Sequence, residues 1–229
     1  MQGNITIQAP FLILCEGRDE LNFLTYFIQS QKPDQKKLQI INFGGNDDLS
    51  RFLKSLINME GFSDVHAILI MRDAETSHIA AQQSIFGALE RCQLPVPDKI
   101  GHWAEVDDLH VGVLLFPTCD DHPTEGALED LCLQTLKEEH NADILHDIDG
   151  FLTILSARYD RKYPRRFKSQ LHTYFSVTDE YVSLKIGEAC RAGAIDFGHQ
   201  RLSFLHKFIE DGLEYTKDEL ACKEGSEKS

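Results

Sequence analysis

Short apolar runs alternate with amphipathic stretches along the first half of the chain. Five of these runs have the length and apolar content of buried strands. They are Phe11–Cys15, Leu38–Phe43, Ala67–Met71, Trp103–Val106 and Val111–Phe116. Strands that alternate with helical segments build strand-helix-strand units, which place neighbouring strands in parallel. The pattern therefore predicts an α/β fold with a mostly parallel sheet flanked by helices.

The amphipathic stretches carry apolar residues at helical spacing. The predicted helices of this part of the chain are Arg18–Ser30, Asp48–Met59 and Ile79–Cys92, and a fourth runs from Gly126 to about Glu139. Asn46 or Asp47 would cap the second helix, because a short polar side chain can accept a hydrogen bond from the first backbone N–H groups of a helix. Each of these helices follows a predicted strand.

Beyond residue 140 the strand pattern stops, and four further segments have helical spacing. They are Asp143–Ala157, Arg165–Phe175, Val182–Arg191 and Leu202–Leu213. We therefore expect residues 1–140 to form an α/β domain and residues 141–216 to form a C-terminal helical extension packed on it. The remaining residues, 217–229, are polar, and we expect a disordered tail there.

Composition narrows the class of protein. Apolar residues make up 42% and charged residues 26% of the 229 residues, which is ordinary for a soluble globular protein. No stretch has the apolar length of a membrane span, and the first residues lack the basic and then apolar segments of a secretory signal. We expect a cytoplasmic protein without a membrane partner. None of the six cysteines forms a Cys-x-x-Cys pair, so we expect reduced thiols rather than a zinc ribbon or disulfides.

Charge is distributed unevenly along the chain. The net charge is −14, and the segment from Asp98 to Asp149 holds fourteen acidic residues against two lysines. Such a balance argues against a protein that coats nucleic acid, because phosphate binding needs clustered Lys and Arg.

Arg158–Lys168 has the opposite character, since it reads RYDRKYPRRFK. Its cations can bind phosphates while its aromatic rings stack on bases. The candidate nucleic-acid contacts are Arg158, Arg161, Lys162, Arg165 and Arg166. A solvated helix end and turn around Pro164 explains the same pattern equally well.

Three acidic clusters follow predicted strands at Glu16–Asp19, Asp73–Glu75 and Glu125–Asp130. The carboxyl ends of parallel strands meet at one edge of an open α/β sheet, where such folds form a ligand crevice. Carboxylates from separate strands can neutralise a hard cation there, so the clusters predict a site for Mg²⁺ or Mn²⁺. For any single cluster, helix capping or simple solvation is an equally good explanation.

The same clusters resemble a known family. Cys15–Glu20 (CEGRDE) is similar to the Glu-Gly signature that ends the first strand of Toprim domains, which occur in topoisomerases, primases and OLD-family nucleases. Met71–Glu75 (MRDAE) resembles the Toprim Asp-x-Asp motif, and Gly126–Asp130 (GALED) resembles a Gly-x-Leu-Glu segment of OLD-like and stand-alone Toprim-like proteins. The resemblance covers about the first 135 residues and predicts a Toprim-like domain for residues 1–140.

The resemblance implies a Mg²⁺-dependent enzyme that acts on phosphodiester bonds. Glu16 would be the general acid/base or a metal ligand, and Lys168 would correspond to a lysine near the scissile phosphate, where it would stabilise negative charge. The remaining candidate metal ligands are Asp19, Asp73, Glu75, Glu129 and Asp130. Two features depart from the family pattern: Glu75 replaces the second Asp of the motif, and Arg72 precedes it.

Two functions stay open on this basis. The first is a Mg²⁺-dependent nuclease or related phosphodiester enzyme that acts on nucleic acid, favoured by the order of the motifs and by the basic segment. The second is a non-catalytic Toprim-fold regulatory protein that binds a metal or a nucleotide, favoured by the net charge. The sequence leaves open the choice of DNA or RNA, the oligomeric state, and whether a partner ATPase handles the DNA as in OLD-type systems.

Overall fold

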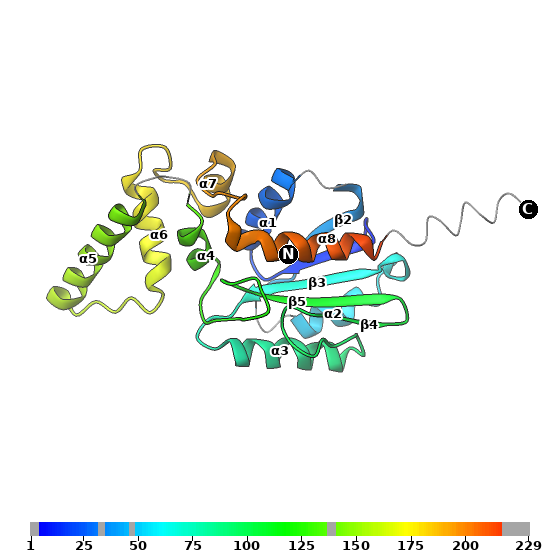
Figure 1. Cartoon of the computed structure of the whole chain (residues 1–229). Helices are drawn as coiled ribbons and strands as arrows, with labels where there is room; N and C mark the ends of the chain where they lie inside the picture. The colour runs from blue at the N-terminus through cyan, green and yellow to red at the C-terminus, as the bar shows by residue number, and fades with distance from the viewer. Residues whose placement is uncertain (1–4, 32–34, 46–48, 137–140, 217–229) are drawn as a thin grey trace, which may run out of the picture.

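The sheet has five strands in the order β2-β1-β3-β5-β4 (Figure 1). The computed structural model describes residues 5–31, 35–45, 49–136 and 141–216. The strands are β1 (Phe11–Cys15), β2 (Leu38–Asn42), β3 (Ala67–Asp73), β4 (Trp103–Val106) and β5 (Leu109–Phe116). All neighbours pair in parallel except β4, which lies antiparallel to β5 at one edge. The predicted mostly parallel sheet is confirmed.

Eight α-helices lie within the described residues, and each corresponds to a predicted one. They are α1 (Arg18–Gln31), α2 (Leu49–Leu56), α3 (His78–Arg91), α4 (Leu128–Gln134), α5 (Asn141–Tyr159), α6 (Arg166–Val177), α7 (Ile186–Ala192) and α8 (Ser203–Glu214). None of the helices in the described ranges combines the length and apolar character needed to cross a bilayer. The predicted α/β fold is confirmed, and the predicted C-terminal helices follow the strands in the chain.

The sheet is covered on both faces, because its inner strands contain the continuous apolar runs Phe11–Cys15, Ala67–Met71 and Val111–Phe116. Phe11, Ile13 and Cys15 of β1 belong to a cluster built with α1 and the C-terminal helices. The alternate residues Leu12 and Leu14 belong to a second cluster, built with α2 and α3. Figure 1 shows α3 on one side of the sheet and α1, α7 and α8 on the other. The fold is thus a three-layer sandwich.

The C-terminal helices contact the sheet layer in different ways. In α8, the ring of Phe208 stacks on Trp103 of β4 with 4.6 Å between ring centroids. Helix α7 packs on α1, and α6 packs on both α4 and α5. Helix α5 lies at the outer end of the molecule, away from the sheet (Figure 1). Residues on both sides of position 140 share one core cluster, and the division into two domains at that position stays a prediction.

Several predicted boundaries were wrong. Strand β3 continues to Asp73, two residues beyond the prediction, because it pairs with β5 as far as Phe116. Helix α4 begins at Leu128 rather than Gly126, because Gly126 has a φ of 135° and forms a β-bridge. Helix α7 begins at Ile186 rather than residue 182, because Ser183 has a φ of 67°, which is not helical.

Other predictions concern residues that the structure does not describe. The cap at Asn46 or Asp47 and the tail 217–229 lie outside the described residues, as does Cys222. The five cysteines that are described are buried and free of disulfide bonds, which agrees with the expected reduced thiols. They are Cys15, Cys92, Cys119, Cys132 and Cys190.

Candidate functional site

A topological switch point lies between β1 and β3, two adjacent inner strands of the sheet. They run side by side and in register, with Cys15 opposite Met71. The chain leaves β1 into α1 on one face of the sheet and leaves β3 into α3 on the other face. Because the two connections diverge, a crevice opens at the carboxyl ends of these strands, which is the usual ligand site of an open α/β sheet.

A cleft of about 770 Å³ lies at this place. Its lining comes from the ends of β1 and β3, the segment leading into α4, and the start of α6. All six predicted metal ligands line it: Glu16, Asp19, Asp73, Glu75, Glu129 and Asp130. Lys168 and Arg165 line it as well. The structure thus brings together residues that are up to about 150 positions apart in sequence, and the volume is within the range of about 300–1,000 Å³ that is common for small-molecule sites.

Asp73 connects the end of β3 to the start of α4. Its Oδ1 accepts a hydrogen bond of 2.9 Å from the backbone N–H of Leu128. Burial, and then the negative charges of Glu20 and Glu129, raise the pKa of Asp73 to about 8. A carboxyl group with this pKa binds a proton readily near neutral pH when no cation is present.

A β-bridge between Glu75 and Gly126 shapes the rim of the cleft. Each residue donates its backbone N–H to the carbonyl oxygen of the other at 2.8 Å. A Cβ atom on Gly126 would come within 2.7 Å of Asp130 Oδ2, and the φ of 135° also favours glycine. Asp130 Oδ2 itself accepts a 2.8 Å hydrogen bond from the backbone N–H of Ala127. The glycine of the GALED segment therefore lets the chain turn tightly around this carboxylate.

Three of the six predicted acids are paired with cations of the protein. Lys168 Nζ lies 2.8 Å from Glu129 Oε1, and Arg165 Nη2 lies 3.0 Å from Glu75 Oε1.

The third pair joins Arg72 Nε and Glu16 Oε2 at 3.5 Å. Arg72 is buried, and burial lowers its pKa, although Glu16 and Asp73 oppose that shift. The unusual arginine before the acidic motif is thus a counter-charge of the site.

Sequence reasoning missed Glu20 as a member of the site. This residue lies in the first turn of α1 and lines the cleft. Burial, and then the charges of Asp19, Glu129 and Glu16, raise its pKa to about 6. A signal was present in the sequence, because Glu20 directly follows Asp19 in the same acidic string.

The donor set fits a hard divalent cation. Carboxylates from separate elements face one cleft, and their mutual repulsion would be relieved by a cation. In the described part of the chain, however, no three acids of the cleft have ligand atoms within 4.8 Å of one another. The group of potential ligands that meets this distance lies outside the cleft and consists of Asp120, Asp121 and His122. A cation in the cleft would therefore draw the carboxylates closer together.

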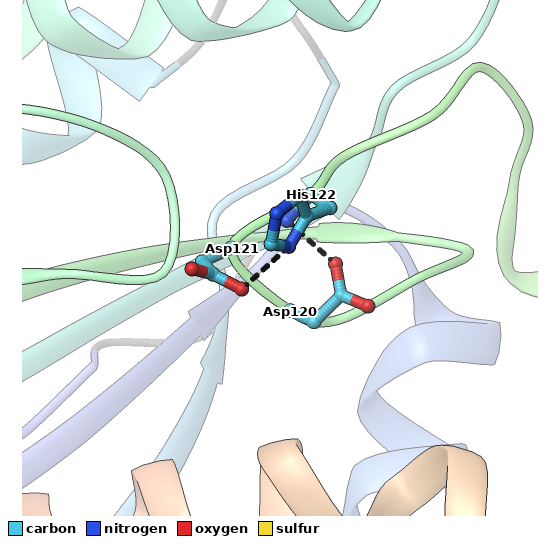
Figure 2. Close-up of side chains that lie close together, drawn as sticks. All are labelled: Asp120, Asp121 and His122. Atoms are coloured by element: carbon cyan, nitrogen blue, oxygen red, sulfur yellow. Dashed lines mark hydrogen bonds and ion pairs between the residues drawn. The ribbon is translucent and has the colours of Figure 1, made fainter.

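The Asp120, Asp121 and His122 set lies in the loop after β5 (Figure 2). Asp120 Oδ1 accepts a 2.8 Å hydrogen bond from the backbone N–H of His122, and Asp121 Oδ1 lies 2.8 Å from His122 Nδ1. Asp121 Oδ2 also pairs with Lys99 Nζ at 3.3 Å. These local contacts account for the cluster, and we assign no metal to it.

The predicted basic segment is divided by the structure. Arg165 lines the cleft, whereas Arg158, Arg161 and Lys162 are exposed and do not line it. Arg166 is turned toward α5, where its Nε lies 2.7 Å from Asp149 Oδ1 and its Nη2 lies 2.7 Å from Thr153 Oγ1. Arg166 therefore stabilises the packing of α6 against α5.

Residues 10–212 match the model of a protein family described as "Protein of unknown function (DUF3226)". The chain belongs to this family. The matched region of this DUF3226 member includes every strand and all the residues that line the cleft. A search of curated proteins gave no match.

Among solved structures, this DUF3226 member is similar to the C-terminal region of the OLD protein of Xanthomonas campestris pv. campestris. A structure of that region phased with mercury is 15% identical, with a TM-score of 0.38, over 94% of this chain and 98% of the other. A second structure, phased with platinum, is 16% identical, with a TM-score of 0.37, over 96% and 97% of the two chains.

Proposed function

We propose that this protein is a Mg²⁺-dependent enzyme that cleaves phosphodiester bonds of nucleic acid. The observation that supports this most directly is the meeting of Glu16, Asp73 and Glu129 with Lys168 in one cleft at the switch point of the sheet. Carboxylates from separate elements together with a nearby lysine form the set that metal-assisted phosphoryl transfer uses. The order of the Toprim-like motifs leads to the same residues.

The roles of the residues follow from their positions. Asp73, Glu129 and Glu16 would hold the metal, with Asp19, Glu75 and Asp130 as further ligands around the cleft. The bound metal would supply Lewis acidity and a water of lowered pKa. Lys168 would move its ammonium group from Glu129 to the scissile phosphate, where it would stabilise the developing negative charge. Arg72 would hold Glu16 in place through their ion pair.

A second candidate function is a metal- or nucleotide-binding regulatory protein without turnover. The three ion pairs with Arg72, Arg165 and Lys168 favour it, because they neutralise half of the predicted ligands without any metal. In this case the same cleft would bind its ligand and leave it intact.

A cleavage assay separates the two candidates. Purified protein would be incubated with single-stranded and double-stranded DNA and RNA in Mg²⁺, in Mn²⁺ and in EDTA. The proposal expects metal-dependent cleavage that falls at least about 100-fold in Glu16→Gln and in Asp73→Asn, the size expected when one catalytic group is lost. Asp121→Asn is the matched control, because it removes an acid from the loop after β5 and should keep full activity.

The possible outcomes point in different directions. Cleavage that survives both cleft substitutions would exclude this site as the active centre. The regulatory candidate would be selected if calorimetry showed cation binding that is lost in Asp73→Asn while no substrate is cleaved.

A further inference from the structure

Phe167 is an exposed aromatic residue at the rim of an acidic cleft. It lies in the first turn of α6 and lines the cleft together with Arg165 and Lys168. Its side chain is 50% exposed, and neither of the two core clusters found among the described residues includes it. Single exposed aromatic residues are common on protein surfaces, but this one lies within one helical turn of two cations that face the cleft.

The two cations have side chains that can change partner. Arg165 and Lys168 are both substantially exposed and reach Glu75 and Glu129 from the solvent side. Binding of a divalent cation by the acids would weaken both pairs, because the cation neutralises the same carboxylates. The guanidinium and ammonium groups would then be available to phosphate oxygens, for which both are well suited.

Nucleic acid offers two groups that match this arrangement. Phosphates match the cations, and the flat face of a base matches an exposed phenyl ring, because base–aromatic stacking is a common way of binding single strands. The faces of a base inside a duplex are already covered by its stacked neighbours, so such a base cannot lie on Phe167, whereas an unpaired base can. The volume of about 770 Å³ is that of a small-molecule site, which suits a short unpaired segment rather than a whole duplex.

We infer that Phe167 stacks on an unpaired base whose neighbouring phosphates are bound by Arg165 and Lys168, so that the substrate is single-stranded nucleic acid or an unpaired end. This inference shares one assumption with the proposed function, namely that the cleft binds nucleic acid. It makes Phe167 a residue that selects for unpaired strands.

The test compares three labelled oligonucleotides by fluorescence anisotropy in Ca²⁺, with gels to confirm that they stay intact. They are a single strand, a hairpin duplex of the same sequence, and an abasic strand with the same phosphates and no bases. The wild-type protein should bind the single strand about 5- to 150-fold more tightly than the abasic strand, the range for stacking of one base. Phe167→Leu should lose this preference, whereas Phe167→Trp should retain it.

Phe151→Leu is the matched control, because Phe151 is similarly exposed, at 52%, lies on α5 and does not line the cleft. It should bind all three oligonucleotides as the wild type does. Three results would overturn the inference. The wild type could bind the intact and abasic strands equally, Phe167→Leu could keep the preference for the intact strand, or the protein could bind no oligonucleotide at all. Failure of the proposed function has a separate signature, since base-dependent binding without cleavage in Mg²⁺ or Mn²⁺ would exclude the nuclease and leave the stacking role intact.

Discussion

Lys168 of α6 places its Nζ 2.8 Å from Oε1 of Glu129 on α4, so that a lysine of the C-terminal helices neutralises an acid of the cleft. Hydrogen bonding to Glu129 raises the pKa of Lys168, which keeps the lysine charged. A divalent cation that binds Glu129 must compete with this lysine. The same side chain would therefore oppose metal binding in the resting protein and assist the reaction afterwards.

We expect Lys168→Met to separate these two effects. The affinity for Mg²⁺ should rise about fivefold, because loss of a neighbouring positive charge changes the binding energy by about 1 kcal/mol. Single-turnover cleavage should nevertheless fall about 100-fold, because the charge on the scissile phosphate is no longer stabilised. Calorimetry and rapid-quench measurements check the two parts. Lys162→Met is the control, since Lys162 does not line the cleft, and a fall in Mg²⁺ affinity in Lys168→Met would contradict the competition.

Asp73 makes the metal-free protein less stable as the pH rises. Its pKa is about 8 in the folded protein against an ordinary value of 3.8, so between about pH 4 and pH 8 the folded state binds more protons than the unfolded state. The stabilisation is complete below pH 4 and is lost as the pH rises through 8. We expect Asp73→Asn to be more stable than the wild type at pH 8 in EDTA, by an increase in Tm of a few °C, and the difference to vanish near pH 4.

Urea or thermal unfolding at several pH values in EDTA measures this difference. Asparagine keeps an oxygen that can accept the hydrogen bond from Leu128, so the comparison isolates the charge. Asp121→Asn is a suitable control, because its ion pair with Lys99 lowers the pKa of Asp121 and the removal should give no gain at pH 8. If the metal-free wild type became more stable relative to Asp73→Asn between pH 5 and pH 8, the raised pKa of Asp73 would be refuted.

Divalent cations should reverse the effect of pH on stability. At pH 8 Asp73, whose pKa is about 8, is about half ionised, and a cation bound to its carboxylate stabilises the folded state by mass action. We expect Mg²⁺ at on the order of 100 times its Kd to stabilise the wild type by about 2.7 kcal/mol and to leave Asp73→Asn nearly unchanged. Thermal shifts with and without Mg²⁺ test this, and an equal shift in both proteins would place the cation elsewhere.

Arg72→Met should destabilise the fold strongly. Arg72 is buried beside Glu16, and its loss removes the ion pair between the two side chains. Removal of one partner of a buried pair costs about 3–5 kcal/mol, and because Glu16 is partly exposed we expect about 2–3 kcal/mol here. The double variant Arg72→Met/Glu16→Gln should recover at least half of the loss. Denaturant unfolding of the three variants gives the coupling energy, and independent, additive effects would show that the pair does not matter.

Two glycines offer a matched test of how α8 packs on the sheet. A Cβ atom at Gly212 of α8 would lie 2.5 Å from the buried ring of Phe11 on β1, so Gly212→Ala should cost about 1–3 kcal/mol through overpacking. Gly150 of α5 has open space around its Cβ position, and Gly150→Ala should stabilise by about 0.5–1 kcal/mol. Denaturant unfolding measures both, and a stabilising Gly212→Ala would mean that α8 does not pack closely on β1.

The apolar pattern predicted every strand and the existence of every helix, because burial on two faces leaves continuous apolar runs and amphipathic helices leave a period near 3.6. It failed at boundaries that depend on distant contacts. The extension of β3 to Asp73 requires pairing with β5, and the late start of α4 requires the bridge between Glu75 and Gly126. Neither contact leaves a trace in the local sequence.

The acids of the cleft were predictable for a related reason. Once the strands are known to be parallel, residues that follow them must gather at one edge of the sheet, and Glu16 and Asp73 do so. The ion pairs of these acids were not predictable, although the Toprim resemblance had already implied a place for Lys168 near the scissile phosphate. Arg165 and Lys168 reach the cleft because α6 packs on α4, and Arg166, which lies between them in sequence, points instead to Asp149.

The sequence by itself therefore determined the α/β class, the mostly parallel sheet and the edge at which the acidic residues meet, since residue periodicity and the alternation of strands with helices are local patterns. Only the tertiary structure decided which charges face one another. The packing of α6 on α4 set the Lys168–Glu129 and Arg165–Glu75 pairs and the place of Phe167 at the rim of the cleft. The pairing of β1 with β3 set the Arg72–Glu16 pair, and burial in the folded protein raises the pKa of Asp73. These features depend on distances in space, which residue spacing along the chain does not encode.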